Sequence, residues 1–210
     1  MKAVDGINLK INKGEFIAVV GRSGAGKTTL LNLIGTLDRP TSGTVKFKDK
    51  EISNVSNKDL SLLRREKIGF IFQDFNLLPT LTAFENIEVA LALRAIKKDE
   101  LQKKVKFLLN SFGLSKRTDH FPLELSVGQR QKLAIARALA NDPILILADE
   151  PTGEMDPIAG REIVSKLFEL NQESNVTVVV ASHGVFPHHK AKRVLFLKDG
   201  RLVSKEKAGY

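Results

Sequence analysis

The stretch from Phe16 to Thr28, FIAVVGRSGAGKT, determines the fold class of this chain. It begins with a continuous apolar run, Phe16 to Val20, which is typical of a parallel strand buried on both faces. Gly21 to Thr28 then fit the pattern G-x-x-x-x-G-K-S/T, and helical spacing follows from Thr28 to Leu37. The order strand, glycine-rich loop, helix predicts a phosphate-binding loop rather than a turn with a chance Lys-Thr pair.

Each residue type in this loop has a physical role in holding a phosphate chain. The glycines let backbone N–H groups converge on phosphate oxygens, and the helix N-terminus adds partial positive charge. Lys27 is predicted to reach the β- and γ-phosphates, and the Thr28 hydroxyl to ligate Mg²⁺. The predicted nucleotide-binding residues here are Gly21, Arg22, Ser23, Gly24, Ala25, Gly26, Lys27, Thr28 and Thr29.

Outward from the loop, the pattern predicts an α/β core interrupted by a mostly helical insertion. Apolar runs indicate further strands at 68–72, 144–148, 176–181 and 194–197. Residues 44–47 alternate like a surface strand, and Asp199-Gly200 is a hairpin signal. From Thr82 to about Asp142 apolar residues recur at helical steps, and one helix is expected from Gly128 to Ala140.

Composition limits the class of protein. The 210 residues are 42% hydrophobic, which suits one globular unit or two subdomains sharing a core. The absence of cysteine excludes disulfides and fits a reducing compartment. Met1 to Asp5 lack the apolar stretch of a secretory signal, and no apolar run approaches the ~20 residues of a membrane helix. Any link to a membrane is therefore expected to go through a partner.

The net charge of +9 would attract nucleic acid or anionic lipid. However, the lysines are dispersed, with acidic residues between the clusters at 97–98 and 103–106. We interpret them as solvated helix faces. The adjacent pair His188-His189 has no nearby acid or thiol and is interpreted as exposed surface rather than a metal site.

Two acids end the apolar run at 144–148. A buried parallel strand would place Asp149 beside the phosphate loop, where its carboxylate can hold a metal ion through water. Glu150 can then polarise the attacking water as a general base. Two acids after a strand are more often a solvated turn, but the phosphate loop favours the catalytic interpretation.

Ser126 precedes the helix expected from Gly128, in the segment Leu125-Ser126-Val127-Gly128-Gln129. A serine here is an ordinary N-cap, yet its hydroxyl, the free amides and the helix dipole also form a second anion site. The segment resembles the signature motif of the ATP-binding-cassette ATPases. Val127 replaces the first glycine of the usual L-S-G-G-Q, whereas Ser126 and Gly128, which match phosphate-contacting residues, are retained.

The resemblance extends over nearly the whole chain and implies the family's fold, a P-loop NTPase core with a mostly parallel sheet, an antiparallel β subdomain and a helical insert. One domain, 1–210, is expected, with the core and β subdomain in 1–81 and 143–210 and the helical subdomain in 82–142. The implied cofactors are ATP and Mg²⁺. The implied catalytic residues are Glu150, His183, Lys27 and Gln73; Ser126, Gly128, Gln129 and Asp156 complete the nucleotide site, and Thr28, Gln73 and Asp149 the metal site.

Some positions depart from the family pattern. Ser182-His183-Gly184 replaces the usual Thr-His-Asp, and Glu154 places an acid in a loop expected at a dimer contact. An aromatic residue that stacks on adenine normally precedes the first strands, but only Met1 to Gly6 precede Ile7, and the sole tyrosine is Tyr210. We expect either a shortened N-terminus or adenine held through its phosphates and apolar contact.

The resemblance implies two cassettes that clasp two ATP molecules and drive a separate membrane permease. Residues 59–73 and 76–86 resemble the subgroup serving lipoprotein release, macrolide export and cell division, although substrate importers share parts of this stretch. Phe75, Leu77, Leu78 and Phe84 would line a groove for the permease, or else belong to the core. The expected location is cytoplasmic, on the inner face of the cell membrane, with no nucleic-acid partner. The alternatives are a soluble cassette ATPase acting on nucleic acid or ribosomes, or a regulatory cell-division cassette.

Overall fold

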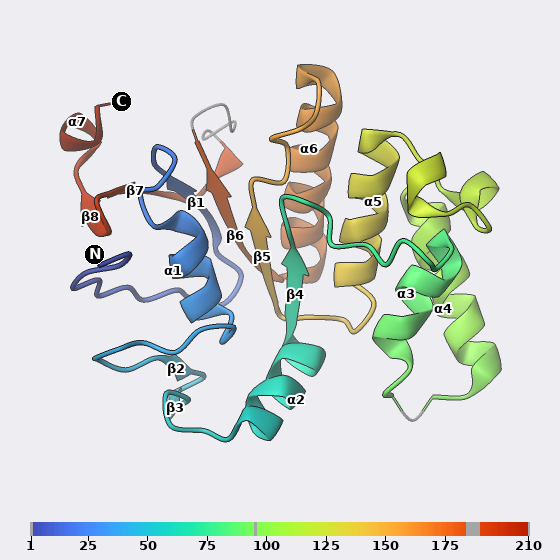
Figure 1. Cartoon of the computed structure of the whole chain (residues 1–210), viewed down its shortest axis with the longest axis horizontal. Coiled ribbons are helices and arrows are strands. Elements are labelled where there is room, and N and C mark those ends of the chain that lie inside the picture. Colours follow the sequence, from blue (N-terminus) through green and yellow to red (C-terminus); the bar gives the residue numbers. More distant parts are fainter. Residues whose placement is uncertain (1, 95, 184–189, 210) are drawn as a thin grey trace.

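A six-stranded sheet forms the centre of the structure, a computed structural model that describes residues 2–94, 96–183 and 190–209 (Figure 1). Its strand order is β4-β5-β6-β1-β7-β8. The first five strands in this order run parallel, and β8 pairs antiparallel with β7. The strands are β1 (Phe16–Val20), β4 (Ile68–Ile71), β5 (Leu145–Asp149), β6 (Thr177–Ser182), β7 (Arg193–Lys198) and β8 (Arg201–Val203).

A second, two-stranded antiparallel sheet lies apart from the first. It consists of β2 (Lys46–Phe47) and β3 (Lys50–Glu51). The residues between them, Lys48 and Asp49, have φ angles of 49° and 64°. Two successive residues with positive φ are what a tight hairpin turn between right-twisted strands requires. The two sheets confirm the predicted α/β fold with a mostly parallel sheet and a small antiparallel one.

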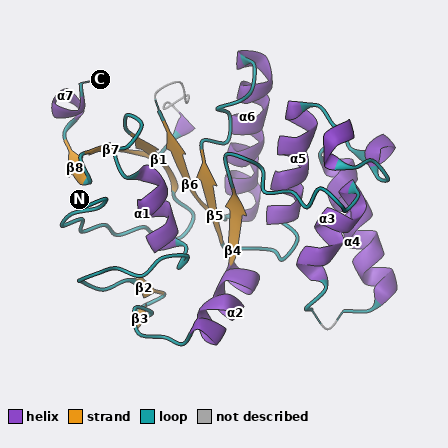
Figure 2. Ribbon diagram, in the orientation of Figure 1, coloured by secondary structure: helices purple, strands orange, loops and turns teal. Residues whose placement is uncertain are grey.

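Helices cover the central sheet and extend beyond its β4 edge (Figure 2). The helices are α1 (Lys27–Ile34), α2 (Asn57–Lys67), α3 (Ala83–Leu91), α4 (Lys98–Ser111), α5 (Val127–Ala138), α6 (Pro157–Ser174) and α7 (Lys205–Ala208), with the 3₁₀ turns η1 (Ser115–Arg117) and η2 (Pro122–Glu124). None of the described helices combines the length and apolar character that spanning a membrane requires.

Residues of the five parallel strands divide between two hydrophobic clusters. In β1, Phe16, Ala18 and Val20 join the cluster that includes residues of α3, α4, α5 and α6. Ile17 and Val19 join the cluster that contains Leu30 and Leu31 of α1. Because side chains alternate across a strand, both faces of β1 are covered by helices, and the run must be apolar throughout. This burial explains the uninterrupted apolar sequence before the phosphate loop.

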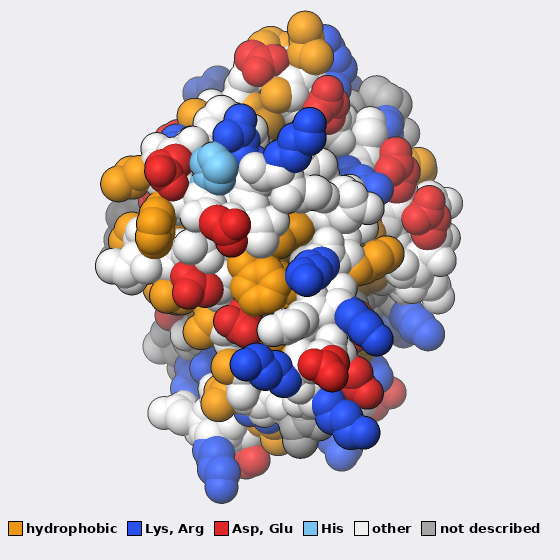
Figure 3. All heavy atoms as spheres, turned by 90° about the vertical axis from the view of Figure 1, so that its right-hand side faces the viewer, with side chains coloured by type: hydrophobic (Ala, Val, Ile, Leu, Met, Phe, Trp, Pro, Cys, Tyr) orange, Lys and Arg blue, Asp and Glu red, His pale blue; other side chains and the backbone are white. Residues whose placement is uncertain are grey.

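Helices α3, α4 and α5 pack against one another beside the sheet, as predicted for the helical insertion. Their buried residues Val105 and Leu109 belong to the same cluster as Ile146 and Val178 of the sheet, so a continuous core joins the two parts. The boundaries of a separate subdomain at 82–142 stay a prediction. On the outer face of these helices, basic and acidic side chains are interspersed (Figure 3).

Several element boundaries differ from the prediction. The first helix ends at Ile34 rather than Leu37, because Gly35 packs closely against Phe70 and Thr36 adopts a φ of 60°. A Cβ atom on Gly35 would lie 2.4 Å from the Phe70 ring. The predicted strand at 44–47 is confined to its last two residues. Helices α2 and α6 had not been assigned from the sequence.

The segment before α3 is fixed by a buried side chain and a capping box. Asn86 is fully buried, and its Nδ2 donates to the carbonyls of Leu78, Leu81 and Thr82 at 2.9–3.1 Å while its Oδ1 accepts from Leu78 N at 2.8 Å. Thr82 and Glu85 exchange the two bonds of the capping box. One amide side chain thus satisfies several backbone groups of the loop.

Replacement of Asn86 by Ala should lower the free energy of unfolding by about 2 to 4 kcal/mol, because it leaves partly buried backbone groups of the loop without partners. Urea unfolding followed by circular dichroism measures this loss. Asn54, which is exposed and whose side chain makes no bond to the described residues, provides the control, and Asn54→Ala should change stability by less than about 0.5 kcal/mol. Equal effects of the two substitutions would contradict the assigned role of Asn86.

Candidate active site

The phosphate loop connects β1 to α1 and can be built only with glycine at two positions. A Cβ atom on Gly21 would lie 2.4 Å from the carbonyl oxygen of Leu197. Gly26 has a φ of 100°, and its Cβ would lie 2.2 Å from the carbonyl oxygen of Ala3. The loop is therefore pressed against β7 and the N-terminal segment, and side chains at these positions would force it open.

The loop presents unpaired donors at the start of α1. Of the amides from Ser23 to Thr29, only that of Ala25 donates to another described residue, the carbonyl of Arg22 at 3.1 Å. Gly26, the N-cap, provides no side-chain cap. Free amides at a helix N-terminus, together with the helix dipole, form an anion site. The side chains of Arg22 and Ser23 are exposed, and that of Thr29 is half-buried.

Lys27 places a nearly buried ammonium group in the middle of this loop. Its residue exposure is 7%, and its Nζ donates to the carbonyls of Gly21 at 2.9 Å and Arg22 at 3.2 Å. The same Nζ lies 3.3 Å from Oε1 of Glu150. A buried ammonium requires such partners, because desolvation of an unpaired charge is costly. The site therefore holds a fixed positive charge next to the free amides.

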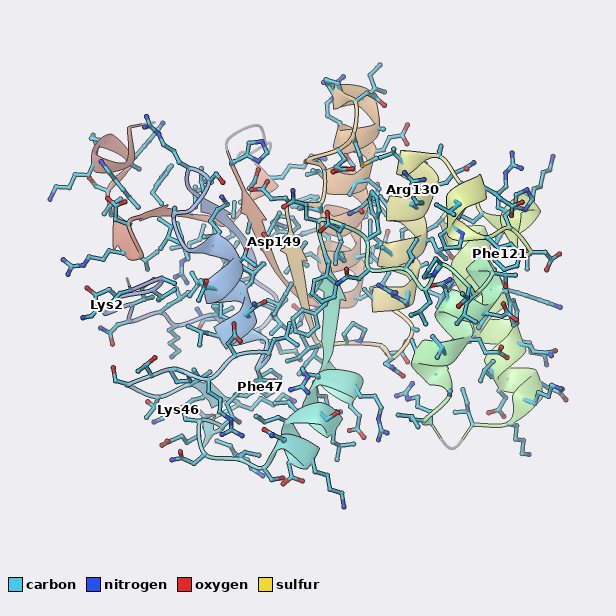
Figure 4. All side chains as sticks on the ribbon, viewed as in Figure 1. Lys2, Lys46, Phe47, Phe121, Arg130 and Asp149 are labelled. Carbon is cyan, nitrogen blue, oxygen red and sulfur yellow. The ribbon has the colours of Figure 1, made fainter. Side chains whose placement is uncertain are left out.

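Asp149 is the last residue of β5, and Glu150 follows it. Strand β5 pairs with β6, which in turn pairs with β1. Asp149 Oδ2 accepts from the Thr28 hydroxyl at 2.6 Å, whereas its Oδ1 is buried without a partner in the described chain. Burial raises the pKa of the Asp149 carboxyl above its ordinary value, opposed by the bond from Thr28. Figure 4 shows Asp149 at the end of β5.

Glu150 is held in an unusual backbone conformation between two cationic or donor groups. Its φ is 46°, in the left-handed region that a residue with a Cβ rarely adopts, and its N–H donates to the carbonyl of Ala181 at 3.0 Å. While Oε1 faces Lys27, Oε2 accepts from the His183 amide at 3.2 Å and lies 2.7 Å from His183 Nδ1. The carboxylate is thus oriented at both oxygens.

The structure therefore brings together Lys27, Thr28, Asp149, Glu150 and His183. They lie at or after the carboxyl ends of β1, β5 and β6, which are adjacent parallel strands, so these ends meet on one side of the sheet. The segment after His183 up to residue 189, which includes Gly184 and the pair His188-His189, lies outside the described residues, as does Tyr210.

The donor set around Asp149 fits Mg²⁺. The unpaired, buried Oδ1 and the Thr28 hydroxyl are hard oxygen donors of the type that Mg²⁺ prefers. No group of three or more His, Cys, Asp or Glu residues in the described part of the chain could hold a metal by itself. A Mg²⁺ ion here would accordingly depend on water and substrate phosphate oxygens for its remaining ligands.

Ser126, Gly128 and Gln129 form a separate group at the start of α5. Ser126 is the exposed N-cap, and its Oγ accepts from Gln129 N at 3.3 Å while Gln129 Oε1 accepts from Ser126 N at 3.0 Å. This capping box confirms the predicted N-cap. Among the described residues, these side chains bond within their own segment and not to the phosphate loop.

Two other predicted site residues lie outside the charged cluster. Asp156 is the N-cap of α6 and accepts from the amides of Ile158 at 2.9 Å and Ala159 at 3.0 Å, and these bonds lower the pKa of its carboxyl. Gln73 is exposed after β4, and its side chain has no hydrogen-bond partner in the described chain. Glu154 is also exposed.

The structure adds two arginines that the sequence interpretation missed. Both contact Phe75, which lies two residues after Gln73. Arg137 donates to the Phe75 carbonyl, and the Arg130 guanidinium lies over the Phe75 ring. The available signal was their spacing of seven residues on one helix, which places both on one helix face. Of the proposed groove residues, Leu77 and Phe84 pack against the core, whereas Leu78 is 42% exposed.

Comparisons with known proteins agree with this geometry. Residues 4–153 match the family model described as ABC transporter. The chain is 44% identical over 209 residues to the uncharacterized ABC transporter ATP-binding protein MJ0796 of Methanocaldococcus jannaschii, covering 98% of this chain and 89% of that protein. It is also 47% identical over 205 residues to the macrolide export ATP-binding/permease protein MacB of Campylobacter jejuni, covering 96% of this chain but 32% of that protein.

Solved structures give the same assignment. The dimeric post-hydrolysis structure of the MJ0796 ATP-binding cassette, bound to ADP and Pi, has a TM-score of 0.90 at 42% identity, covering 96% of this chain and 89% of that one. CbiO1 of Clostridium perfringens, part of an ABC transporter complex, has a TM-score of 0.86 at 32% identity, covering 96% and 80%. The macrolide-export relative agrees with the predicted subgroup. The chain belongs to the ABC transporter family and is an ATP-binding cassette of that family.

Proposed function

We propose that this cassette hydrolyses ATP with Mg²⁺ and thereby drives a separate membrane permease of the lipoprotein-release or macrolide-export type. The main support is the convergence of Lys27 and His183 on the two oxygens of the Glu150 carboxylate, beside the Thr28–Asp149 bond. This arrangement combines a phosphate-binding cation with an oriented base, and both are needed to transfer a phosphoryl group to water.

Each residue in the cluster has a proposed role toward ATP. The amides from Gly21 to Thr29 and the Lys27 ammonium would bind the β- and γ-phosphates, replacing water with fixed donors. Thr28 and Asp149, with Gln73, would hold Mg²⁺, which when bound neutralises charge on the phosphate oxygens. Glu150 would orient the attacking water and accept its proton. His183 would hold the Glu150 carboxylate in place and contact the γ-phosphate.

A complete site is proposed to need two copies of the chain. Ser126 is exposed at the start of α5, its segment makes no bond to the phosphate loop of its own chain, and the MJ0796 cassette has been solved as a dimer. Ser126, Gly128, Gln129 and Asp156 of one copy would thus face the γ-phosphate held by the other. Nucleotide would join the copies, and its cleavage would release them.

Besides a second copy of the chain, the proposed partner is a membrane permease, which the cassette would contact at the inner face of the cell membrane. MacB of Campylobacter jejuni has a name that joins an ATP-binding part to a permease, and this chain spans about a third of its length. CbiO1 is described as part of an ABC transporter complex. Leu78 is exposed and Phe75 is half-buried. These two residues are the part of the proposed groove that a permease segment can reach.

Replacement of Glu150 by Gln should leave ATP binding within about twofold of wild type but lower kcat by roughly 10²- to 10⁴-fold, because the amide cannot accept the proton of water. Phosphate release and equilibrium binding of a fluorescent ATP analogue measure the two effects. Glu169→Gln on the exposed face of α6 is the matched control and should retain full activity. A Glu150→Gln protein that turns over at the wild-type rate would exclude Glu150 as the base.

Replacement of Lys27 by Ala should lower both ATP affinity and kcat, the latter by roughly 10²- to 10³-fold, since a preorganised positive charge is lost from the phosphates. Lys13 is exposed outside the loop, and Lys13→Ala should have no effect on either quantity. Calorimetric titration with ATP and steady-state hydrolysis provide the measurements. Unchanged binding and turnover in Lys27→Ala would be incompatible with the proposed phosphate site.

A further inference from the structure

The loop that carries Gln73 is attached to α5 through an unusual backbone segment. Phe75 and Asn76 both have positive φ angles, 60° and 47°, although neither is glycine. Such conformations persist only where the surroundings fix them. Two local backbone bonds contribute, from Phe75 N to the Phe72 carbonyl at 3.1 Å and from Asn76 N to the Asp74 carbonyl at 2.6 Å. The side chain that fixes the segment is that of Arg137, whose Nη2 donates to the Phe75 carbonyl at 2.8 Å and whose Nη1 donates to the Asn76 carbonyl at 2.5 Å.

Arg130, seven residues before Arg137 on the same face of α5, contacts the side chain of Phe75. Its guanidinium lies 5.5 Å from the centre of the Phe75 ring, within the range of a cation–π contact. It also donates to the carbonyl of Leu125 at 2.8 Å, immediately before the N-cap Ser126. Figure 4 labels Arg130 on α5. One continuous set of contacts therefore runs from the start of α5 to the loop of Gln73.

Gln73 itself has no comparable support. Its side chain is exposed and makes no bond to the described residues, so its position depends on the backbone on both sides of it, with β4 ending at Ile71 before it. Two residues later, the Phe75 carbonyl is held by Arg137. Further along the chain, the Asn86 side chain on α3 donates to the carbonyls of Leu78 and Leu81. The segment after Gln73 is therefore fixed to the helices α5 and α3.

We propose that Arg137, assisted by Arg130, is a positioning residue that places Gln73 for the reaction and ties its location to α5, the helix whose N-cap is Ser126. The proposal rests on the proposed ATP hydrolysis and adds two residues whose bonds within the described chain go to Leu125, Phe75 and Asn76 rather than to the phosphate loop. The guanidinium is suited to this task because its planar fork serves two adjacent carbonyls at once, which a lysine ammonium on a flexible stem cannot reproduce.

The kinetic test separates positioning from folding. Arg137→Lys should lower kcat roughly 10- to 100-fold, as outer-shell substitutions around metal sites do, with KM for ATP changed by less than about twofold. ATP affinity is retained because the phosphate loop does not contact Arg137. Arg130→Gln should give a smaller decrease in kcat. Lys132→Gln, which removes a half-buried α5 cation paired with Glu162, is the matched control and should keep wild-type kcat.

A double-mutant cycle with Gln73 identifies the route of the effect. If Arg137 acts through Gln73, then Arg137→Lys in a Gln73→Ala background should lower kcat by less than about twofold further, because the two changes remove the same interaction. Full multiplication of the two losses would overturn the proposal. An inactive wild-type protein would instead contradict the proposed function, so the two failures are distinguishable.

A readout independent of activity is available because the chain contains no cysteine. A single Cys introduced at the exposed Asp74 can carry a nitroxide label, whose spectrum reports how tightly the loop is held. Arg137→Lys should increase the mobility of this label while the melting temperature and circular dichroism show a folded protein. An unchanged label spectrum in the folded variant would overturn the proposal, as would an equal increase in Lys132→Gln.

Discussion

The site is organised around one nearly buried ammonium group. Lys27 Nζ is held by two carbonyls of its own loop and by Glu150, and the fold excludes most solvent from the residue. A charge in this position must be compensated, so the loop, the end of β5 and the histidine after β6 have to meet within a few ångströms of one another. The glycines at 21 and 26 make this possible, since side chains there would collide with Leu197 and Ala3.

The parallel sheet provides the rest of the arrangement. Residues more than 120 positions apart in the chain, such as Thr28 and Asp149, become neighbours because β1, β6 and β5 are adjacent and point in the same direction. Helices on both faces keep these strands buried, and their uniform apolar sequence follows from that burial. Ser126 is the N-cap of α5, and its segment makes no bond to the phosphate loop within the described residues. In the proposed pair it would face the nucleotide of the other copy.

The elements that follow directly from local sequence could be predicted, and those that depend on tertiary contacts could not. The apolar runs around Phe16, Ile68 and Ile146 identified buried strands, and the Asp-Gly signal identified the β7–β8 hairpin, because each needs only its own residues to specify it. Helix α2 is weakly apolar with a single buried residue, Leu60, and gave little periodic signal. Helix α6 does carry a local start signal, with Asp156 as N-cap and Pro157 in the first turn. From the sequence, Asp156 is assigned to the nucleotide site only, and no helix is predicted there. For the site, the phosphate loop and the two acids follow a local pattern, whereas the contact of Arg137 with Phe75 joins residues 62 positions apart and required the structure.

The central claim, that each phosphate loop is completed by Ser126 of a second copy, can be tested by mixing two inactive variants. One carries Lys27→Ala and the other Ser126→Arg, so a mixed pair contains one site with both halves intact. The account predicts that each variant alone lacks Mg²⁺-dependent ATP hydrolysis and that an equimolar mixture regains about a quarter of the wild-type rate, from statistical pairing of the copies. Failure of the mixture to regain activity, with both variants folded and the wild type active, would contradict it, as would full activity of Ser126→Arg alone.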